Sequence, residues 1–280
     1  MAAMIDRWQL FEAGHCRHPE IAARRDGALR PCQFPSLAAA LHHRQHGWLL
    51  FDTGYASHFL QATEPFPERL YRWTTPVHGA SEQALAGQLQ AQGIAPAQVA
   101  HIVLSHLHGD HVAGVADFPQ AQVYCAEAAW AHLQQCNRVQ ATANGYLPAL
   151  LADVPDRLTG LQALPLAATV PAPLHGFAPP RDLFGDGSVL LVDLPGHAPG
   201  HTGLWFADAD GPVFLVADAA WSSDALEQAV LPPALVTAWL GDGPRYRDTF
   251  ARLHALGRQY PGVRLIPSHC RRWRPARGSA

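Results

Sequence analysis

Four side chains that can bind metal ions occur within six residues of this 280-residue sequence: His106, His108, Asp110 and His111. They follow the apolar run 102–104, which predicts a buried strand. Because alternate residues of extended backbone point the same way, the first two histidines can bind one ion. Gly109 then permits a turn, beyond which the aspartate and the third histidine are placed to begin a second site. Imidazole and carboxylate ligands suit zinc and similar first-row metals.

Several candidate ligands share their position, just past the end of an apolar, strand-like run: His106, His197, Asp218 and His269. In α/β folds, ligands generally bind at the loops that leave one edge of a rigid sheet. We therefore expect these side chains to lie at the same edge. Two neighbouring ions would also need one ligand that bridges them.

Hydrophobic periodicity and turn residues predict the elements that position these ligands. Strands are expected at 5–13, 37–44, 48–51, 102–104, 122–125, 188–193, 204–207, 213–217 and 263–266. Helices are expected at 81–92, with Ser81 as N-cap and Gly93 as the stop, and at 126–135 and 245–260. The polar segment between the first two strands is expected to be a loop, because its histidines and cysteines match no metal-ligand spacing: His15, Cys16, His18 and Cys32.

Composition narrows the class of protein. Hydrophobic residues make up 48% of the chain and charged residues only 15%, which indicates a compact globular protein. The net charge of −3 does not indicate a nucleic-acid partner. All 20 basic residues are arginine, which excludes a catalytic lysine and a lysine Schiff base.

Cellular location is inferred from signals that the sequence lacks. Five scattered cysteines without a Cys-x-x-Cys pair do not predict a disulfide framework. The N-terminal residues show no charged region followed by an apolar one, so no secretion signal is expected. No apolar run reaches the roughly 18 residues of a membrane span. We therefore expect a cytoplasmic protein without a membrane partner.

The proline-rich segment at about 138–187 is too long for an ordinary connection, and such segments are usually functional lids or binding loops. Its apolar residues, Tyr146 and Phe177 among them, are candidates to roof a pocket and contact substrate. The alternative is a structural insertion with a small core of its own.

Five motifs occur in one order along the chain: FDTG at Asp52, SHLHGDH, LPGHAPGHTG, the aspartate of VADA and the histidine of PSH. In this order they resemble the metallo-β-lactamase-fold hydrolase superfamily, and the match runs from Asp52 to His269. The resemblance implies an α/β fold (α+β in some schemes), a four-layer αβ/βα sandwich of two similar halves. Residues 1–280 would form a single such domain, with 138–187 as its insertion or lid.

The resemblance also implies a site with two divalent metal ions, zinc by default, with manganese, iron or cobalt as alternatives. The motif match places three ligands on one metal: His106, His108 and His197. It places three on the other: Asp110, His111 and His269. Asp218 would bridge the two ions, and a hydroxide shared between them would attack the substrate.

Catalytic roles follow for two of these ligands. Asp218 would hold the ions that share the hydroxide, and Asp110 beside it would carry a proton to the leaving group. Asp52 and His201 resemble residues that support the ligands, and a direct role for His201 is the alternative.

Other branches of the superfamily fit less well. True β-lactamases generally lack an aspartate at the position of Asp218, and diiron oxidoreductases have a glutamate where this chain has His108. LFEAGHC, the DTG turn and DLFGDGSVLLVDLPGHAPGH are most similar to the branch of N-acyl-homoserine lactonases and related esterases. Those lactonases typically have a tyrosine where this chain has Trp221, which either forms an apolar wall for substrate or packs in the core.

The expected function is hydrolysis of a small-molecule ester, lactone or thioester, with lactonase-like activity preferred. A glyoxalase II-like thioesterase is the alternative, in which arginines would hold glutathione, such as Arg245, Arg271 or Arg272. A mononuclear iron sulfur dioxygenase and a non-catalytic metal-binding module are further alternatives. Whether the chain forms a homodimer is left open.

Overall fold

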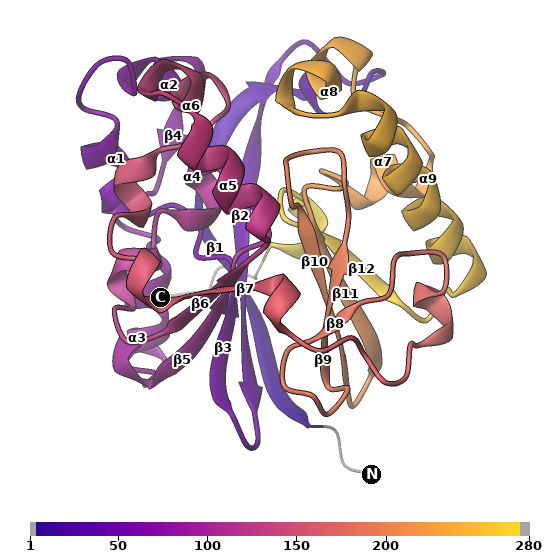
Figure 1. Ribbon diagram of the computed structural model, residues 1–280. Coiled ribbons are helices and arrows are strands. Elements are labelled where there is room, and N and C mark those ends of the chain that lie inside the picture. Colours follow the sequence, from indigo (N-terminus) through magenta and orange to yellow (C-terminus); the bar gives the residue numbers. More distant parts are fainter. Residues whose placement is uncertain (1–3, 275–280) are drawn as a thin grey trace.

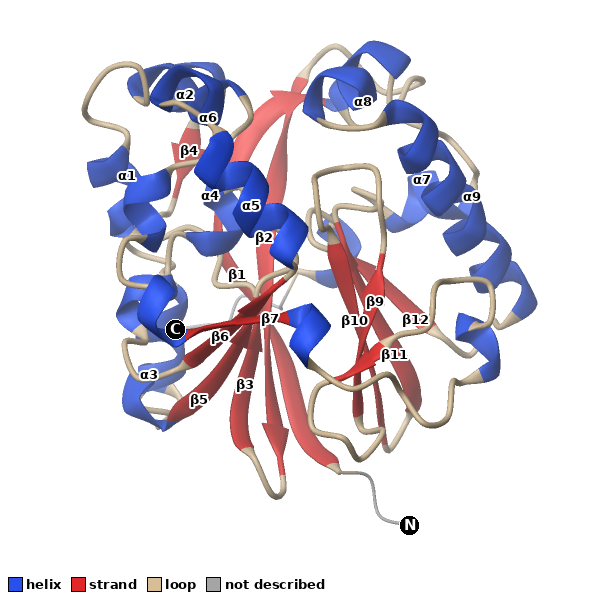
Figure 2. Ribbon diagram, in the orientation of Figure 1, coloured by secondary structure: helices blue, strands red, loops and turns tan. Residues whose placement is uncertain are grey.

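Two β-sheets stack face to face, and helices cover the outer face of each (Figure 1). The computed structural model describes residues 4–274. Figure 2 shows the resulting order of layers, which is helices, sheet, sheet, helices. The predicted four-layer sandwich is therefore confirmed.

The first sheet has seven strands in the order β4-β1-β2-β3-β5-β6-β7. Their bounds are β1 (Ile5–Pro19), β2 (Pro31–His43), β3 (Gly47–Phe51), β4 (Val77–His78), β5 (Val99–Val103), β6 (Gln122–Cys125) and β7 (Leu158–Gly160). The second sheet has five strands in the order β12-β11-β10-β9-β8. Their bounds are β8 (Arg181–Asp182), β9 (Val189–Asp193), β10 (Thr202–Asp208), β11 (Gly211–Ala217) and β12 (Arg264–Pro267). Both sheets are mixed, since each joins antiparallel and parallel pairs.

The helices divide between the two halves in sequence order. The first half carries α1 (Ser57–Ala62), α2 (Arg69–Thr74), α3 (Leu85–Ala91), α4 (Gly109–Val112), α5 (Glu127–Gln135) and α6 (Arg138–Ala143). The second half carries α7 (Ser223–Glu227), α8 (Ala234–Leu240) and α9 (Gly243–Gln259). Within the described residues, no helix is long and apolar enough to cross a membrane.

Three apolar cores hold the four layers together. Because successive side chains of a strand point to opposite faces of the sheet, one strand can contribute to two cores. In β3, Leu49 and Phe51 face the other sheet, whereas Trp48 and Leu50 face the helices of the first half. On α9, apolar residues at helical spacing face the second sheet: Tyr246, Phe250, Leu253 and Leu256. The central strand β3 is thus packed on both faces, and α9 covers the outer face of the second sheet.

The predicted strands and helices are present, with two corrections. The first helix begins at Leu85 rather than 81, and its N-cap is Ala84 and not Ser81. The predicted loop containing His15, Cys16 and His18 is wrong, because β1 continues to Pro19. A register shift between Glu12 and His15, at Gly14 with φ of 75°, bulges the strand before it pairs again with β2. Cys32 lies in β2, which begins at Pro31.

The proline-rich segment 138–187 contributes to all three cores. Leu150 is buried in the first core, Leu161 in the second and Leu174 in the third. The segment includes α6, β7 and β8, joined by short 3-10 turns. Its role as a lid stays a prediction.

We expect Gly241→Ala to destabilise the protein by about 1–3 kcal/mol through overpacking. A Cβ at this position would lie 2.2 Å from the carbonyl oxygen of Gly196 and 2.4 Å from that of His197. Gly176→Ala is the control, because nothing lies within 4 Å of its Cβ position. Chemical denaturation measures both variants, and equal stabilities would contradict the prediction.

Candidate metal centre

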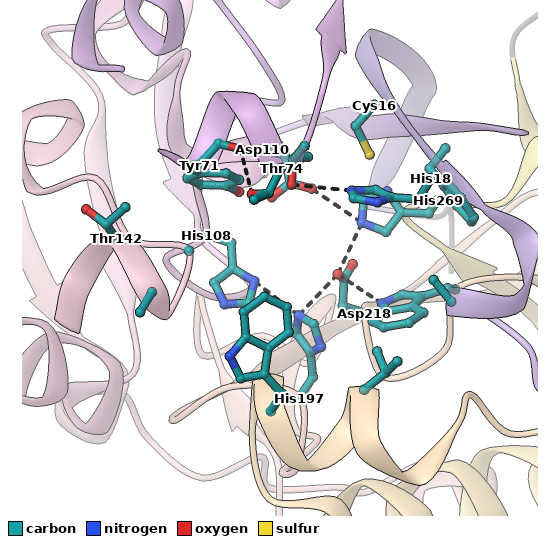
Figure 3. Close-up of a pocket in the computed structure, with 18 of the residues that line it drawn as sticks. Cys16, His18, Tyr71, Thr74, His108, Asp110, Thr142, His197, Asp218 and His269 are labelled. Atoms are coloured by element: carbon teal, nitrogen blue, oxygen red, sulfur yellow. Dashed lines mark hydrogen bonds and ion pairs between the residues drawn. The ribbon is translucent and has the colours of Figure 1, made fainter. Parts of the chain in front are cut away.

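The residues predicted as metal ligands meet where strands of the two sheets end. Figure 3 labels His108, Asp110, His197, Asp218 and His269 among them. The first sheet supplies those that follow β5 and begin α4: His106, His108, Asp110 and His111. The second sheet supplies those that follow β9, β11 and β12: His197, Asp218 and His269. All seven side chains are buried. The expectation that strand ends bring them together is therefore met.

Three imidazoles form the first group that could hold a metal ion, and they are His106, His108 and His197. His108 Nδ1 lies 2.9 Å from His106 Nε2 and 3.2 Å from His197 Nε2. Burial lowers the pKa of His108 to about 4 and holds the pKa values of the other two well below the usual range. Neutral imidazoles with converging nitrogens are the form in which histidine binds metals.

Asp110, His111 and His269 form a second group that could hold a metal ion. Asp110 Oδ2 lies 3.4 Å from His269 Nε2 and 3.7 Å from His111 Nε2. This mixed set of nitrogen and oxygen ligands also suits zinc.

Asp218 lies between the two groups, as Figure 3 shows. Its Oδ2 is 3.2 Å from His197 Nε2 in the first group and 3.1 Å from His269 Nε2 in the second. Its Oδ1 is 3.4 Å from His111 Nε2. One carboxylate therefore reaches both groups.

Opposite charges outweigh burial at this centre. Burial alone would raise the pKa of Asp218, but the imidazoles of His269, His111 and His197 hold it well below the usual range. Burial alone would lower the pKa of His111, but the carboxylates of Asp110, Asp52 and Asp218 raise it well above that range. The carboxylates thus give the centre negative charge, which protons on the imidazoles balance. Divalent cations can replace those protons.

Outer hydrogen bonds fix which nitrogen of two histidines faces inward. His111 Nδ1 lies 2.7 Å from Asp52 Oδ2, and His269 Nδ1 lies 2.7 Å from the carbonyl oxygen of Pro35. Both oxygens accept, so each Nδ1 donates its proton outward and each Nε2 faces the centre, where a metal ion can replace the proton on that nitrogen. In the part of the chain that the structure describes, His111 Nε2 has no hydrogen-bond partner. A buried ring nitrogen without a hydrogen-bond partner is consistent with a metal ligand.

Asp52 links the DTG turn to the ligand motif. Besides the imidazole of His111, its carboxylate accepts hydrogen bonds from the backbone N–H of Ser105 at 2.8 Å and from its hydroxyl at 2.7 Å. The Ser105 hydroxyl also lies 3.0 Å from His106 Nδ1. One buried carboxylate therefore orients the segment that carries four of the ligands.

Three further residues form hydrogen bonds with Asp218. His201 Nε2 accepts the backbone N–H of Asp218 at 3.1 Å, so the lone pair of that nitrogen is already used. Trp221 Nε1 donates to Asp218 Oδ2 at 3.2 Å, and the hydroxyl of Ser268 donates to Oδ1. The position of this carboxylate between the two groups is thus fixed by three hydrogen bonds.

A cavity of about 440 Å³ opens directly onto this centre. Its walls are mainly apolar, and α2, α6 and α8 contribute Leu70, Val139 and Trp239. Trp221 lines the cavity, as predicted for a substrate contact. No arginine is among the described residues that line it.

The other two predicted substrate contacts lie elsewhere. Phe177 packs against Phe214 at the third core, with ring centroids 6.0 Å apart, and is not among the described residues that line the cavity. Tyr146 is buried beside the His108 ring at 5.4 Å and belongs to the first core rather than to the cavity lining. Both are apolar residues that the fold uses for packing.

Cys16 and His18 line the cavity, although the sequence did not indicate it. His18 Nε2 lies 3.3 Å from Thr75 Oγ1. These residues lie on β1 beyond the bulge at Gly14, where the alternation of apolar residues is interrupted. In the sequence, the one hint that both residues face the cavity is that they are two positions apart, which places them on the same face of a strand.

A separate cluster of His43, His46 and Asp186 has ligand atoms close enough to hold a metal ion. His43 Nδ1, however, accepts the backbone N–H groups of Gln45 and His46 at 3.1 and 3.2 Å. Its proton must therefore be on Nε2, which lies 3.0 Å from the Ser188 hydroxyl. With that nitrogen protonated, the cluster is better explained as a turn stabilised by a buried imidazole.

The family model of the metallo-beta-lactamase superfamily matches residues 36–255. The chain belongs to this superfamily. A probable metallo-hydrolase of Mycobacterium tuberculosis is 28% identical over 236 residues, which cover 80% of this chain and 71% of that protein. The N-acyl homoserine lactonase AttM of Azorhizobium caulinodans is 30% identical over 162 residues, which cover 56% of this chain and 54% of that lactonase.

Solved structures of lactonases share the fold. An N-acyl homoserine lactone hydrolase with N-hexanoyl-L-homoserine at its catalytic metal centre superimposes with a TM-score of 0.71 at 18% identity, over 97% of this chain and 95% of that chain. The dizinc quorum-quenching lactonase AidC gives 0.62 at 17% identity, over 95% and 89%. At this identity the likeness establishes the fold alone, and the buried histidine and aspartate clusters are this chain's own evidence for a metal site.

We expect Asp52→Asn to lower the free energy of unfolding by about 1–3 kcal/mol, because an amide cannot accept all three hydrogen bonds and leaves a buried donor unpaired. Less metal should also remain after dialysis, because His111 loses its orientation. Chemical denaturation and elemental analysis measure the two effects. Asp210→Asn, at an exposed position, is the control. Unchanged stability and metal content would show that Asp52 is dispensable.

Proposed function

We propose that this chain is a dinuclear metal-dependent hydrolase that cleaves an uncharged ester or lactone with an apolar substituent. The observation that carries the proposal is the position of Asp218, which reaches both ligand groups at the end of an apolar cavity. Two carboxylates and five imidazoles at one buried point have little other use in a hydrolase fold.

The ligands divide as the geometry of the two groups suggests. His106, His108 and His197 would hold one ion, and Asp110, His111 and His269 the other, with Asp218 shared. Zinc is the metal that this donor set fits best. When bound, two such cations act as Lewis acids and lower the pKa of a bound water.

The remaining steps belong to side chains of this chain. Asp110 lines the cavity and reaches the metal group, so it is placed to hand a proton to the departing oxygen. His201 holds the backbone of Asp218, and Asp52 holds His111. These contacts keep the reacting groups in position before substrate binds.

Trp221 occupies the position at which the lactonase branch typically has a tyrosine. Its indole N–H donates to Asp218, so that donor is already used and does not replace a tyrosine hydroxyl. The ring also forms part of the cavity wall. We infer that Trp221 orients the shared carboxylate and contacts the apolar part of the substrate.

Charge distinguishes the lactonase-like function from the thioesterase alternative. Glutathione carries carboxylates, whose burial needs a cationic partner. The arginines considered for that task have carboxylate partners instead: Arg245 with Asp242, Arg271 with Glu20, and Arg272 with Asp224 and Glu227. This pairing favours an uncharged substrate.

We expect Asp110→Asn to reduce kcat about 10²- to 10⁴-fold while two metal ions remain bound, because the amide keeps the shape but cannot carry the proton. Steady-state kinetics and elemental analysis measure the two quantities together. Asp156→Asn, on an exposed turn, is the control. Full turnover with two metals would refute the proton-transfer role, and a single iron in the wild type would favour the dioxygenase alternative.

We expect an acyl-homoserine lactone with an apolar chain to be hydrolysed with a kcat/KM at least about tenfold above that of a glutathione thioester, a difference of about 1.4 kcal/mol. The physical reason is the absence of arginine from the described cavity lining. Treatment with a chelator should abolish both activities. A faster reaction with the thioester would reverse the assignment of substrate class.

A further inference from the structure

Exposed apolar side chains are concentrated on segments that also contribute to the cavity wall. Seven of the eight large hydrophobic residues exposed in the described chain lie on four segments, 20–30, 64–74, 138–143 and 231–247. We call these seven the apolar rim: Leu29, Phe66, Leu70, Trp73, Val139, Leu235 and Trp239. Contiguous exposed apolar patches on soluble proteins usually mark sites of interaction.

The four segments surround one opening. Each also supplies a residue to the cavity wall, namely Ala23, Leu70, Val139 and Trp239. Figure 1 shows α2 and α6 on one side and α8 on the other side of the same end of the molecule. The segment 20–30 joins the residues that precede α8 through a hydrogen bond of 3.0 Å from the backbone N–H of Arg25 to the carbonyl oxygen of Leu231.

Substrate alone does not account for the rim. Trp73 and Leu235 are 64% and 83% exposed, and neither they nor Phe66 lines the cavity. Exposed tryptophan and phenylalanine side chains are typical of proteins that meet the boundary between lipid and water.

The rim is also the basic part of an acidic protein. Its four segments carry eight arginines against five acidic residues, whereas the whole chain has 20 against 23. On α2, Arg69 and Arg72 directly precede the exposed residues Leu70 and Trp73. Both arginines donate to backbone carbonyl oxygens rather than to carboxylates. Such an excess attracts an anionic surface.

We propose that the apolar rim docks the protein on an anionic lipid surface, with the cavity mouth facing the lipid. The apolar side chains would enter the headgroup boundary, and the arginines would contact lipid phosphates. A second copy of the chain is the weaker occupant, because two identical faces with the same excess charge repel each other. This partner differs from the sequence-based expectation, which considered only membrane spans.

Vesicle sedimentation of the metal-loaded full chain tests the proposal. We expect binding to vesicles of phosphatidylcholine with about one quarter phosphatidylglycerol, weaker binding to pure phosphatidylcholine, and a loss of affinity at high salt. The triple variant Phe66→Ser, Trp73→Ser and Leu235→Ser should lower the partition coefficient at least about tenfold. None of these residues lines the cavity, so hydrolysis of a soluble substrate should not change.

Leu166→Ser is the matched control, since Leu166 is the eighth exposed residue and lies on the segment bridged to Arg181, outside the rim. Wild-type protein that does not bind the anionic vesicles would overturn the proposal, and so would equal binding of the triple and control variants. Light scattering provides a further test. A dimer that the triple variant dissociates, without vesicle binding, would make the rim a self-association surface. The vesicle assay does not use catalysis, so its result is independent of the proposed function.

Discussion

A single buried carboxylate, Asp218, lies within 3.2 Å of imidazoles that come from separate strands of the second sheet, His197 and His269. Burial of an ionised carboxylate costs several kcal/mol unless opposite charges and hydrogen bonds compensate it. The imidazoles of His197 and His269 compensate this charge, and the Trp221 indole and the Ser268 hydroxyl donate hydrogen bonds to it. His201 accepts the backbone N–H of the same aspartate. The rest of the site can be understood as the set of contacts that keep this charge in place.

Hydrogen bonds between the two halves occur right beside the ligands. The backbone N–H of Thr202 donates to the carbonyl oxygen of Ser105 at 2.8 Å, and that of Leu37 donates to Ser268 at 2.9 Å. His269 Nδ1 faces the carbonyl oxygen of Pro35 on β2, which belongs to the other sheet. The ligand geometry therefore depends on the packing between the sheets, which the second core maintains.

The ligands could be found from sequence because each of them follows a strand that a short apolar run is enough to predict. The residues of the cavity wall could not be found in this way. β1 changes face at a bulge, which hid Cys16 and His18, and the helices that carry Leu70 and Trp239 are too short for a periodic signal. Apolar residues such as Phe177 fit a core or a pocket equally well by composition. Only the tertiary arrangement separates those two uses.

Short helices supply much of the cavity wall, whereas most of the candidate ligands follow the ends of strands, and this difference has an evolutionary consequence. Substitutions in the short helices can change what fits the cavity while the strand ends keep the metal centre intact. The exception is Gly241, where the end of α8 touches the backbone of the His197 loop. Divergence to new substrates should therefore be free along most of α8 and stop at Gly241, where any side chain would displace the backbone that carries His197.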